Sequence, residues 1–133
     1  MFLFRQAAAE DSRARALRWL YQRFARDNNP EARGLSLLRR WLSSEQRAQF
    51  DANGYFDVIG CDSGRRYRIH HGTATNVIEL DETGARKTGW CFIPVGNLVA
   101  GDVMLAQKIA LETNEFGALA VAQRFSGPFL TRA

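Results

Sequence analysis

The first part of the chain has the apolar spacing of helices. Between residues 7 and 27 apolar side chains recur every three or four positions, which predicts an amphipathic helix. A second helix is predicted over residues 30–42, because Pro30 is suited to the first turn of a helix. Ser43 and Gln46 have the spacing of a capping box, which predicts a third, short helix that ends at Gly54.

After residue 54 the pattern changes to the alternation that is typical of strands. Four strands are predicted, at residues 55–60, 66–70, 76–80 and 88–93. Gly64 and Gly84 lie in the short connections, where a tight turn requires positive φ, so we expect consecutive antiparallel strands. Asp102 is a suitable N-cap for a last helix over residues 103–114, with a bend or a restart through residues 116–125.

These elements predict an α+β fold with N-terminal helices, a four-stranded antiparallel β-meander and a C-terminal helix packed on the sheet. A chain of 133 residues can bury one core without disulfides, so we expect a single domain over residues 1–133. Within it we distinguish a helical N-terminal extension (1–34), a compact α+β module (35–125) and a tail (126–133). The residues expected in the core are Leu38, Trp41, Phe50, Phe56, Val58, Tyr67, Ile69, Leu105 and Ile109.

The composition favours a cytoplasmic protein. No apolar run approaches the roughly 20 residues that a membrane-spanning helix needs. The apolar start of the chain is interrupted by Arg5, unlike a signal peptide. Cys61 and Cys91 are the two cysteines and lack CxxC spacing, so we expect reduced thiols rather than a disulfide framework.

Basic residues are concentrated in the N-terminal part of the chain. Residues 1–50 contain ten arginines and five acidic residues, whereas residues 51–133 contain eight basic and nine acidic residues. An electrostatic partner would therefore be anionic and would meet the N-terminal helices first. The alternative is that these arginines form a solvated helix face that keeps the protein soluble.

Cysteine and histidine side chains raise the question of a metal site. If Ser63 and Gly64 form a two-residue turn, Asp57 lies opposite His70, and Cys61 is about four residues from His70 along the ladder. At ~3.3 Å per residue this is about 13 Å, too far for two bonds to one ion. We therefore expect no metal and no cofactor.

The same register makes Asp57 and His70 a cross-strand pair in which the carboxylate orients the imidazole. Such a pair is a general-base candidate only beside a nucleophile, and no recognisable motif places Cys61 or Cys91 there. The sequence therefore predicts no catalytic residue and favours a non-enzymatic function, with the pair as a surface contact between strands.

Large apolar residues near the chain ends have no clear place in so small a core. Exposed apolar patches usually mark partners or self-association. We therefore expect a non-enzymatic protein-interaction module, a self-associating accessory subunit or adaptor. The candidate partner-binding residues are Phe2, Phe4, Arg18, Trp19, Arg23, Arg39, Arg40 and Arg68.

Nucleic-acid association is the alternative function. It would use the Arg-rich N-terminal helices and the strand from Arg65 to Arg68, where arginines flank Tyr67. A continuous basic face would favour nucleic acid, while aromatic residues clustered around Trp19 would favour a protein partner. A membrane surface is the least favoured partner of the three.

Six short segments carry a resemblance to known proteins. The segments are LSSEQ (42–46), GYFDV (54–58), GRRYRI (64–69), LDETG (80–84), CFIP (91–94) and DVMLAQK (102–108). With them, residues 35–112 resemble a family of small uncharacterised bacterial proteins. The family has no known activity, so the resemblance implies a compact module and no functional residues.

Overall fold

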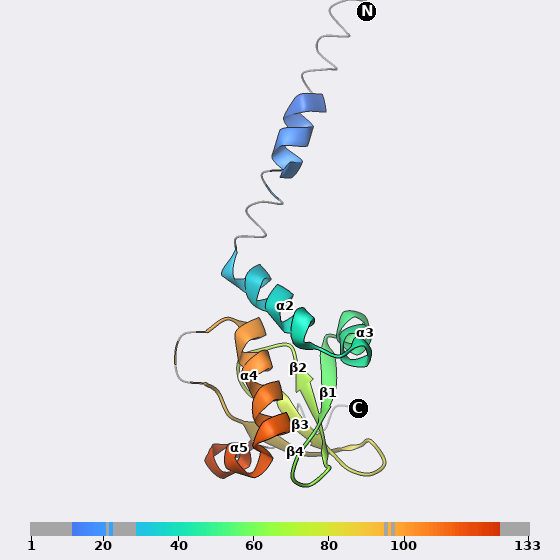
Figure 1. Cartoon of the computed structure of the whole chain (residues 1–133), viewed down its shortest axis with the longest axis vertical. Helices are drawn as coiled ribbons and strands as arrows, with labels where there is room; N and C mark the ends of the chain where they lie inside the picture. Colours follow the sequence, from blue (N-terminus) through green and yellow to red (C-terminus); the bar gives the residue numbers. More distant parts are fainter. Residues whose placement is uncertain (1–11, 21, 23–28, 95, 97, 126–133) are drawn as a thin grey trace, which may run out of the picture.

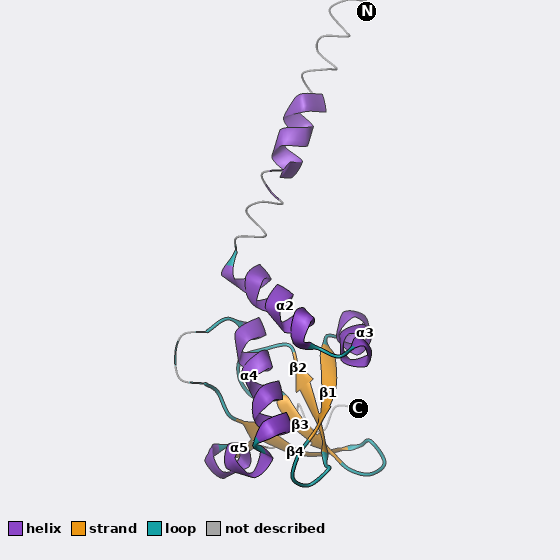
Figure 2. Cartoon of the chain, in the orientation of Figure 1, coloured by secondary structure: helices purple, strands orange, loops and turns teal. Residues whose placement is uncertain are grey.

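In a computed structural model of the chain, the described residues are 12–20, 22, 29–94, 96 and 98–125. Helices and one antiparallel sheet form an α+β fold, as predicted (Figure 2). Residues 12–20 are helical, within the range expected for the first helix. Figure 1 shows this helix apart from the sheet and the helices that pack on it.

The two helices before the sheet are α2 (Pro30–Trp41) and α3 (Ser44–Asn53). The predicted capping box of α3 is confirmed. The Ser43 hydroxyl accepts a hydrogen bond from the Gln46 backbone N–H at 3.1 Å, and the Gln46 side chain accepts one from the Ser43 backbone at 3.0 Å. Gly54 ends α3 with a φ of 76°, which glycine adopts without strain.

The sheet has five strands in chain order, and each pairs antiparallel with the next. They are β1 (Tyr55–Ile59), β2 (Arg66–His70), β3 (Val77–Leu80), β4 (Arg86–Cys91) and β5 (Gln123–Phe125). The predicted four-stranded meander is confirmed, and β5 extends it.

The fifth strand corrects the expectation of helix through residue 125. Phe125 lies opposite Gly89 of β4 in the ladder. A side-chain carbon at Gly89 would lie 2.4 Å from the Phe125 ring, so the ring occupies the space that a larger residue would fill. This contact joins positions far apart in the chain, and helical spacing does not reveal it.

The last helices are α4 (Ala100–Thr113) and α5 (Glu115–Val121). The prediction that Asp102 caps the C-terminal helix is wrong, since α4 begins earlier and its N-cap makes no side-chain hydrogen bond. The added turn packs on α2. A side-chain carbon at Gly101 would lie 2.2 Å from the backbone of Gly34, so the two helices cross at a pair of glycines.

The core lies between the sheet, α4 and α2, and α3 packs beside β1 (Figure 1). Most predicted core residues are buried, and Phe50 is partly buried. Two expectations are wrong, because Trp41 is 61% exposed and Ile109 is 45% exposed. Gly34 and Leu38 lie on the side of α2 that faces α4. Leu42 is one turn after Leu38 on this side and is buried, whereas Trp41 lies off this side and is exposed.

Candidate functional site

The helix of residues 12–20 presents apolar side chains to solvent. Every residue in this range is exposed, and Leu17, Trp19 and Leu20 are 66%, 54% and 54% exposed. Leu17 and Leu20 are three residues apart, so they lie on one side of the helix, with Arg13 one turn before Leu17. A helix that leaves large apolar groups exposed has the character of a docking element.

The outer side of α2 has the same combination of apolar and basic residues. Leu37 and Trp41, one helical turn apart, are 40% and 61% exposed. Arg33 and Arg40 are exposed on the same side of the helix. Tryptophan and arginine are the residues that most often carry binding energy in protein interfaces.

The candidate partner-binding residues that the structure describes lie on three elements, the helix of residues 12–20, α2 and β2. Phe2, Phe4 and Arg23 lie outside the described residues. Arg18 and Trp19 are exposed on the helix of residues 12–20, and Arg40 is exposed on α2. Arg39 forms an ion pair with Asp51 of α3, and Arg68 lies on the sheet.

Arg68 forms an ion pair with the neighbouring strand. Its Nε and a terminal nitrogen donate to the two oxygens of Asp57 at 2.8 and 3.2 Å, and its guanidinium lies 4.1 Å from the centre of the Tyr55 ring. The hydrogen bonds with Asp57 raise the pKa of Arg68. A bidentate pair of this kind fixes Arg68 in the sheet, where it stabilises the pairing of β1 and β2.

The predicted opposition of Asp57 and His70 is wrong by two residues. Asp57 lies opposite Arg68, and His70 lies opposite Tyr55. The reason is the length of the β1–β2 turn, which occupies residues 60–65 and is closed by a 2.8 Å hydrogen bond from the Gly60 N–H to the carbonyl of Arg65. Burial, with the positive charge of nearby arginines, lowers the pKa of His70 to about 4.

Cys61 is exposed and Cys91 is half-buried, and both are free thiols. Within the described part of the chain, no three His, Cys, Asp or Glu side chains converge as metal ligands. Over the same residues, no helix combines the length and the apolar character that crossing a membrane requires.

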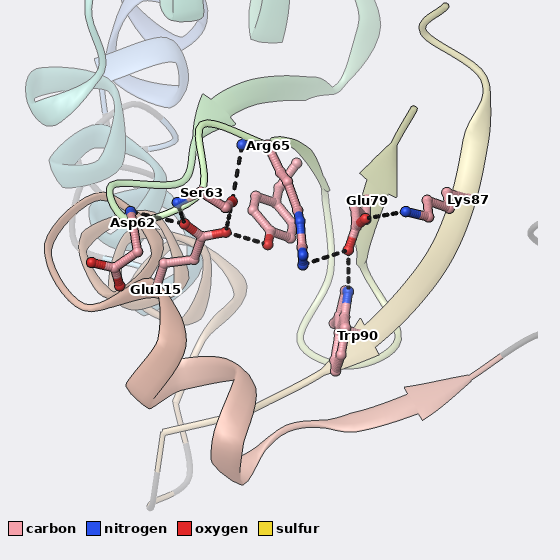
Figure 3. A network of polar contacts seen from close by, with 8 residues as sticks. Asp62, Ser63, Arg65, Glu79, Lys87, Trp90 and Glu115 are labelled. Carbon is pink, nitrogen blue, oxygen red and sulfur yellow. Dashed lines mark hydrogen bonds and ion pairs between the residues drawn. The ribbon is translucent and has the colours of Figure 1, made fainter. Parts of the chain in front are cut away.

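A network that the sequence did not predict surrounds Glu115, the first residue of α5 (Figure 3). The side chain is fully buried. Its Oε1 accepts hydrogen bonds from the backbone N–H groups of Asp62 and Ser63 at 2.9 and 2.8 Å. Its Oε2 accepts from the hydroxyls of Ser63 and Tyr67 at 2.5 and 2.6 Å. Glu115 therefore holds the β1–β2 turn to the junction of α4 and α5.

Burial and hydrogen bonding have opposite effects on this carboxyl group. Burial raises the pKa of Glu115, but the hydrogen bonds from Ser63, Tyr67 and the backbone outweigh it, and the pKa lies below its ordinary value. Burial and the Glu115 carboxylate raise the pKa of Tyr67, so its hydroxyl remains a donor. Because Glu115 is fully buried and accepts from both backbone and side-chain donors of the turn, this arrangement anchors the turn.

Glu79 of β3 is a second buried carboxylate, 3% exposed. The indole N–H of Trp90 donates to its Oε1 at 3.1 Å. Arg65 and Lys87 approach it at 3.9 and 3.5 Å (Figure 3). The sequence contained a signal for this residue, since a glutamate in the middle of the buried strand Val77–Leu80 must have partners for its charge. No local pattern indicated Glu115.

Comparison of the chain with models of protein families, with curated proteins and with solved structures gives no match.

Proposed function

We propose that this protein is a non-enzymatic protein-interaction module, a self-associating accessory subunit or adaptor that docks through its N-terminal helices. The observation that carries the proposal is the exposure of Leu17 and Leu20, 66% and 54%, on one side of a helix in which every residue from 12 to 20 is exposed. Full burial of an exposed leucine is worth about 1.5–3 kcal/mol, and a partner that covers the remaining exposed area of these two side chains gains part of that amount for each.

The core of the α+β fold contains no residue from positions 12–20. This core is formed by α2, α4 and the sheet. The exposed side of α2, with Trp41 at 61% exposure, supplies a second apolar contact near this core. A partner, whether a second copy or another protein, would cover groups that the folded domain leaves in solvent.

Nucleic-acid association remains a second candidate because of one observation. Residues 12–20 contain Arg13, Arg15 and Arg18 and no acidic residue. Phosphate binding depends on this charge and weakens with salt, whereas helix docking depends on the apolar side chains. Two added negative charges should therefore weaken nucleic-acid binding wherever they lie on this helix, whereas they should weaken helix docking only where they replace the leucines.

The test uses two double variants of the full chain. Leu17→Glu with Leu20→Glu removes the apolar stripe, and Ser12→Glu with Ala14→Glu adds the same two charges to the same helix without removing a large apolar group. Sedimentation velocity reports self-association, and affinity purification from the source cell with mass spectrometry reports other protein partners. Fluorescence polarisation at low salt reports binding to DNA and RNA.

A protein-interaction module gives a defined complex that is lost in the leucine double variant and kept in the control. Equal weakening by both variants, with binding of DNA or RNA, indicates the nucleic-acid function instead. A monomeric chain that recovers neither protein nor nucleic acid contradicts both proposals.

A further inference from the structure

A cleft of about 700 Å³ lies at the end of the sheet, between the β1–β2 and the β3–β4 turns. Glu79 lines it together with Arg65 and Lys87, which approach the carboxylate from opposite sides in Figure 3. The cleft shares no lining residue with α2 or with residues 12–20, so it is independent of the proposed docking surface.

Glu79 retains hydrogen-bonding capacity toward this cleft. Among the described residues, the Trp90 indole is its one donor at ordinary hydrogen-bond length, 3.1 Å. The nitrogens of Lys87 and Arg65 are 3.5 and 3.9 Å away, longer than a normal charge-assisted hydrogen bond. Buried carboxylates are ordinarily satisfied by several close donors, so the second oxygen of Glu79 can accept a donor from a ligand.

Both walls of the cleft are fixed by hydrogen bonds. Glu115 holds the β1–β2 turn through the backbone of Ser63 at 2.8 Å. Asp81 holds the β3–β4 turn by accepting from the backbone N–H groups of Thr83 and Ala85 at 2.8 and 2.9 Å. A preformed cleft does not have to be ordered when a ligand binds, which favours affinity.

The charges decide the class of ligand. A cationic group alone would add a third positive charge beside Arg65 and Lys87, and an anion alone would lie against Glu79. A zwitterion satisfies both, because its ammonium or guanidinium group donates to Glu79 while its carboxylate accepts from the two displaced cations. The side chains of Arg65 and Lys87 are 48% and 60% exposed, so they have room to reorient.

We propose that this cleft binds a small zwitterion of the amino-acid class. Glu79 takes the ligand's cationic nitrogen, and Arg65 and Lys87 take its carboxylate. Trp90, whose indole N–H donates to Glu79, reports ligand binding through that carboxylate.

The experiment follows the indole N–H signals of the isotopically labelled full chain by NMR, with Trp19 and Trp41 as internal references. The probes are the standard amino acids, tested in pools and then singly up to about 10 mM, where a ligand of millimolar Kd is bound. The matching amine without the carboxylate and the matching acid without the amine follow for each hit.

A saturable shift of the Trp90 signal by one amino acid, with both truncated analogues about tenfold weaker or worse, is the expected result. Glu79→Gln and Lys87→Ala each weaken binding, and Lys87→Ala leaves the buried carboxylate in place if Glu79→Gln fails to fold. Glu45→Gln, the same change at an exposed carboxylate on α3 that does not line the cleft, leaves binding unchanged.

The proposal is overturned if no amino acid moves the Trp90 signal, or if an analogue with one charge binds as well as the zwitterion. Equal binding by Glu79→Gln and the unmodified chain overturns the role of Glu79. None of these results bears on docking by the N-terminal helices, because the leucine double variant tests that surface separately.

Discussion

Replacing Glu115 by alanine removes the buried carboxylate that anchors the β1–β2 turn. Four donors lose their acceptor at once, two backbone N–H groups and two hydroxyls. Hydrogen bonds to a charged group contribute about 1.5–3 kcal/mol each, but burial of the carboxylate itself costs several kcal/mol. Since removing one member of a buried charged network costs about 3–5 kcal/mol, we expect that loss from Glu115→Ala.

Glu115→Gln is the informative second variant, because glutamine keeps the shape of the side chain and one acceptor oxygen. Its oxygen can accept from the backbone N–H groups of Asp62 and Ser63, which donate to Glu115 Oε1 in the unmodified chain. Its amide N–H₂ then faces the hydroxyls of Ser63 and Tyr67, and hydroxyls can accept as well as donate. We therefore expect Glu115→Gln to lose about 1–2 kcal/mol, clearly less than alanine.

The pH dependence of stability distinguishes the carboxylate from its shape. Because the folded-state pKa of Glu115 lies below its ordinary value, the unfolded chain binds this proton first. The contribution of Glu115 to stability is therefore complete above about pH 4.3, the ordinary glutamate pKa, and is lost as the pH falls through the folded-state pKa. Glutamine at position 115 does not titrate, so the difference in unfolding free energy between Glu115→Gln and the unmodified chain decreases as the pH falls.

Urea unfolding followed by circular dichroism at pH 7 and at several lower pH values measures both effects. The alanine variant must have the lower midpoint at neutral pH, with glutamine between it and the unmodified chain. A loss below about 1 kcal/mol for alanine, or an unchanged difference between Glu and Gln down to pH 3, would refute the anchoring role of the carboxylate.

Three further predictions concern other parts of the fold. The His70 ring should titrate near pH 4, and stability should fall as the pH drops from the ordinary value of 6.5 toward 4, because the unfolded chain protonates first; an NMR midpoint near 6.5 contradicts this. Gly101→Ala should lose about 1–3 kcal/mol in urea unfolding, since its new carbon meets the backbone of Gly34; unchanged stability excludes that close crossing. Leu38→Ala should lose about 2–5 kcal/mol and Trp41→Ala at most about 0.5, and equal losses would show that Trp41 is in the core.

Local chemistry accounts for the parts of the fold that the sequence predicted well. Ser43 and Gln46 are three residues apart, and the capping box that they form needs no distant partner. Gly64 and Gly84 adopt φ values of 77° and 85°, so their turns could be recognised from the chain itself. Alternation of apolar residues likewise identified β1 to β4.

The expectations that failed all depend on contacts between distant segments. The register of β1 and β2 follows from a turn whose backbone donates to Glu115, more than fifty residues later. The start of α4 follows from the crossing with α2 at Gly34, and β5 follows from the Phe125 ring over Gly89. No spacing rule within one segment contains this information, because the register, the start of α4 and the position of β5 each depend on which residues tertiary packing brings together.

The candidate cleft was missed for a related reason. Glu79 is visible in the sequence as an acid within an apolar strand, but its partners come from the β1–β2 turn and from β4. The order of charges along a chain does not show whether such a carboxylate already has hydrogen-bond donors. That requires the distances: the Trp90 indole donates to Glu79 at 3.1 Å, whereas the nitrogens of Lys87 and Arg65 are 3.5 and 3.9 Å away.

The helix α4 separates the two proposed surfaces. Its N-terminal turn meets α2 at Gly101, and its C-terminal end meets the β1–β2 turn, where the Cys61 N–H donates to the Leu111 carbonyl at 3.0 Å. At 1.5 Å of rise per residue, the fourteen residues of α4 span about 20 Å. Substitutions that far apart, with no shared partner, act independently, so a variant that abolishes docking and a variant that abolishes ligand binding should combine without interaction. A coupling between them would mean that α4 moves as one body when either surface is occupied.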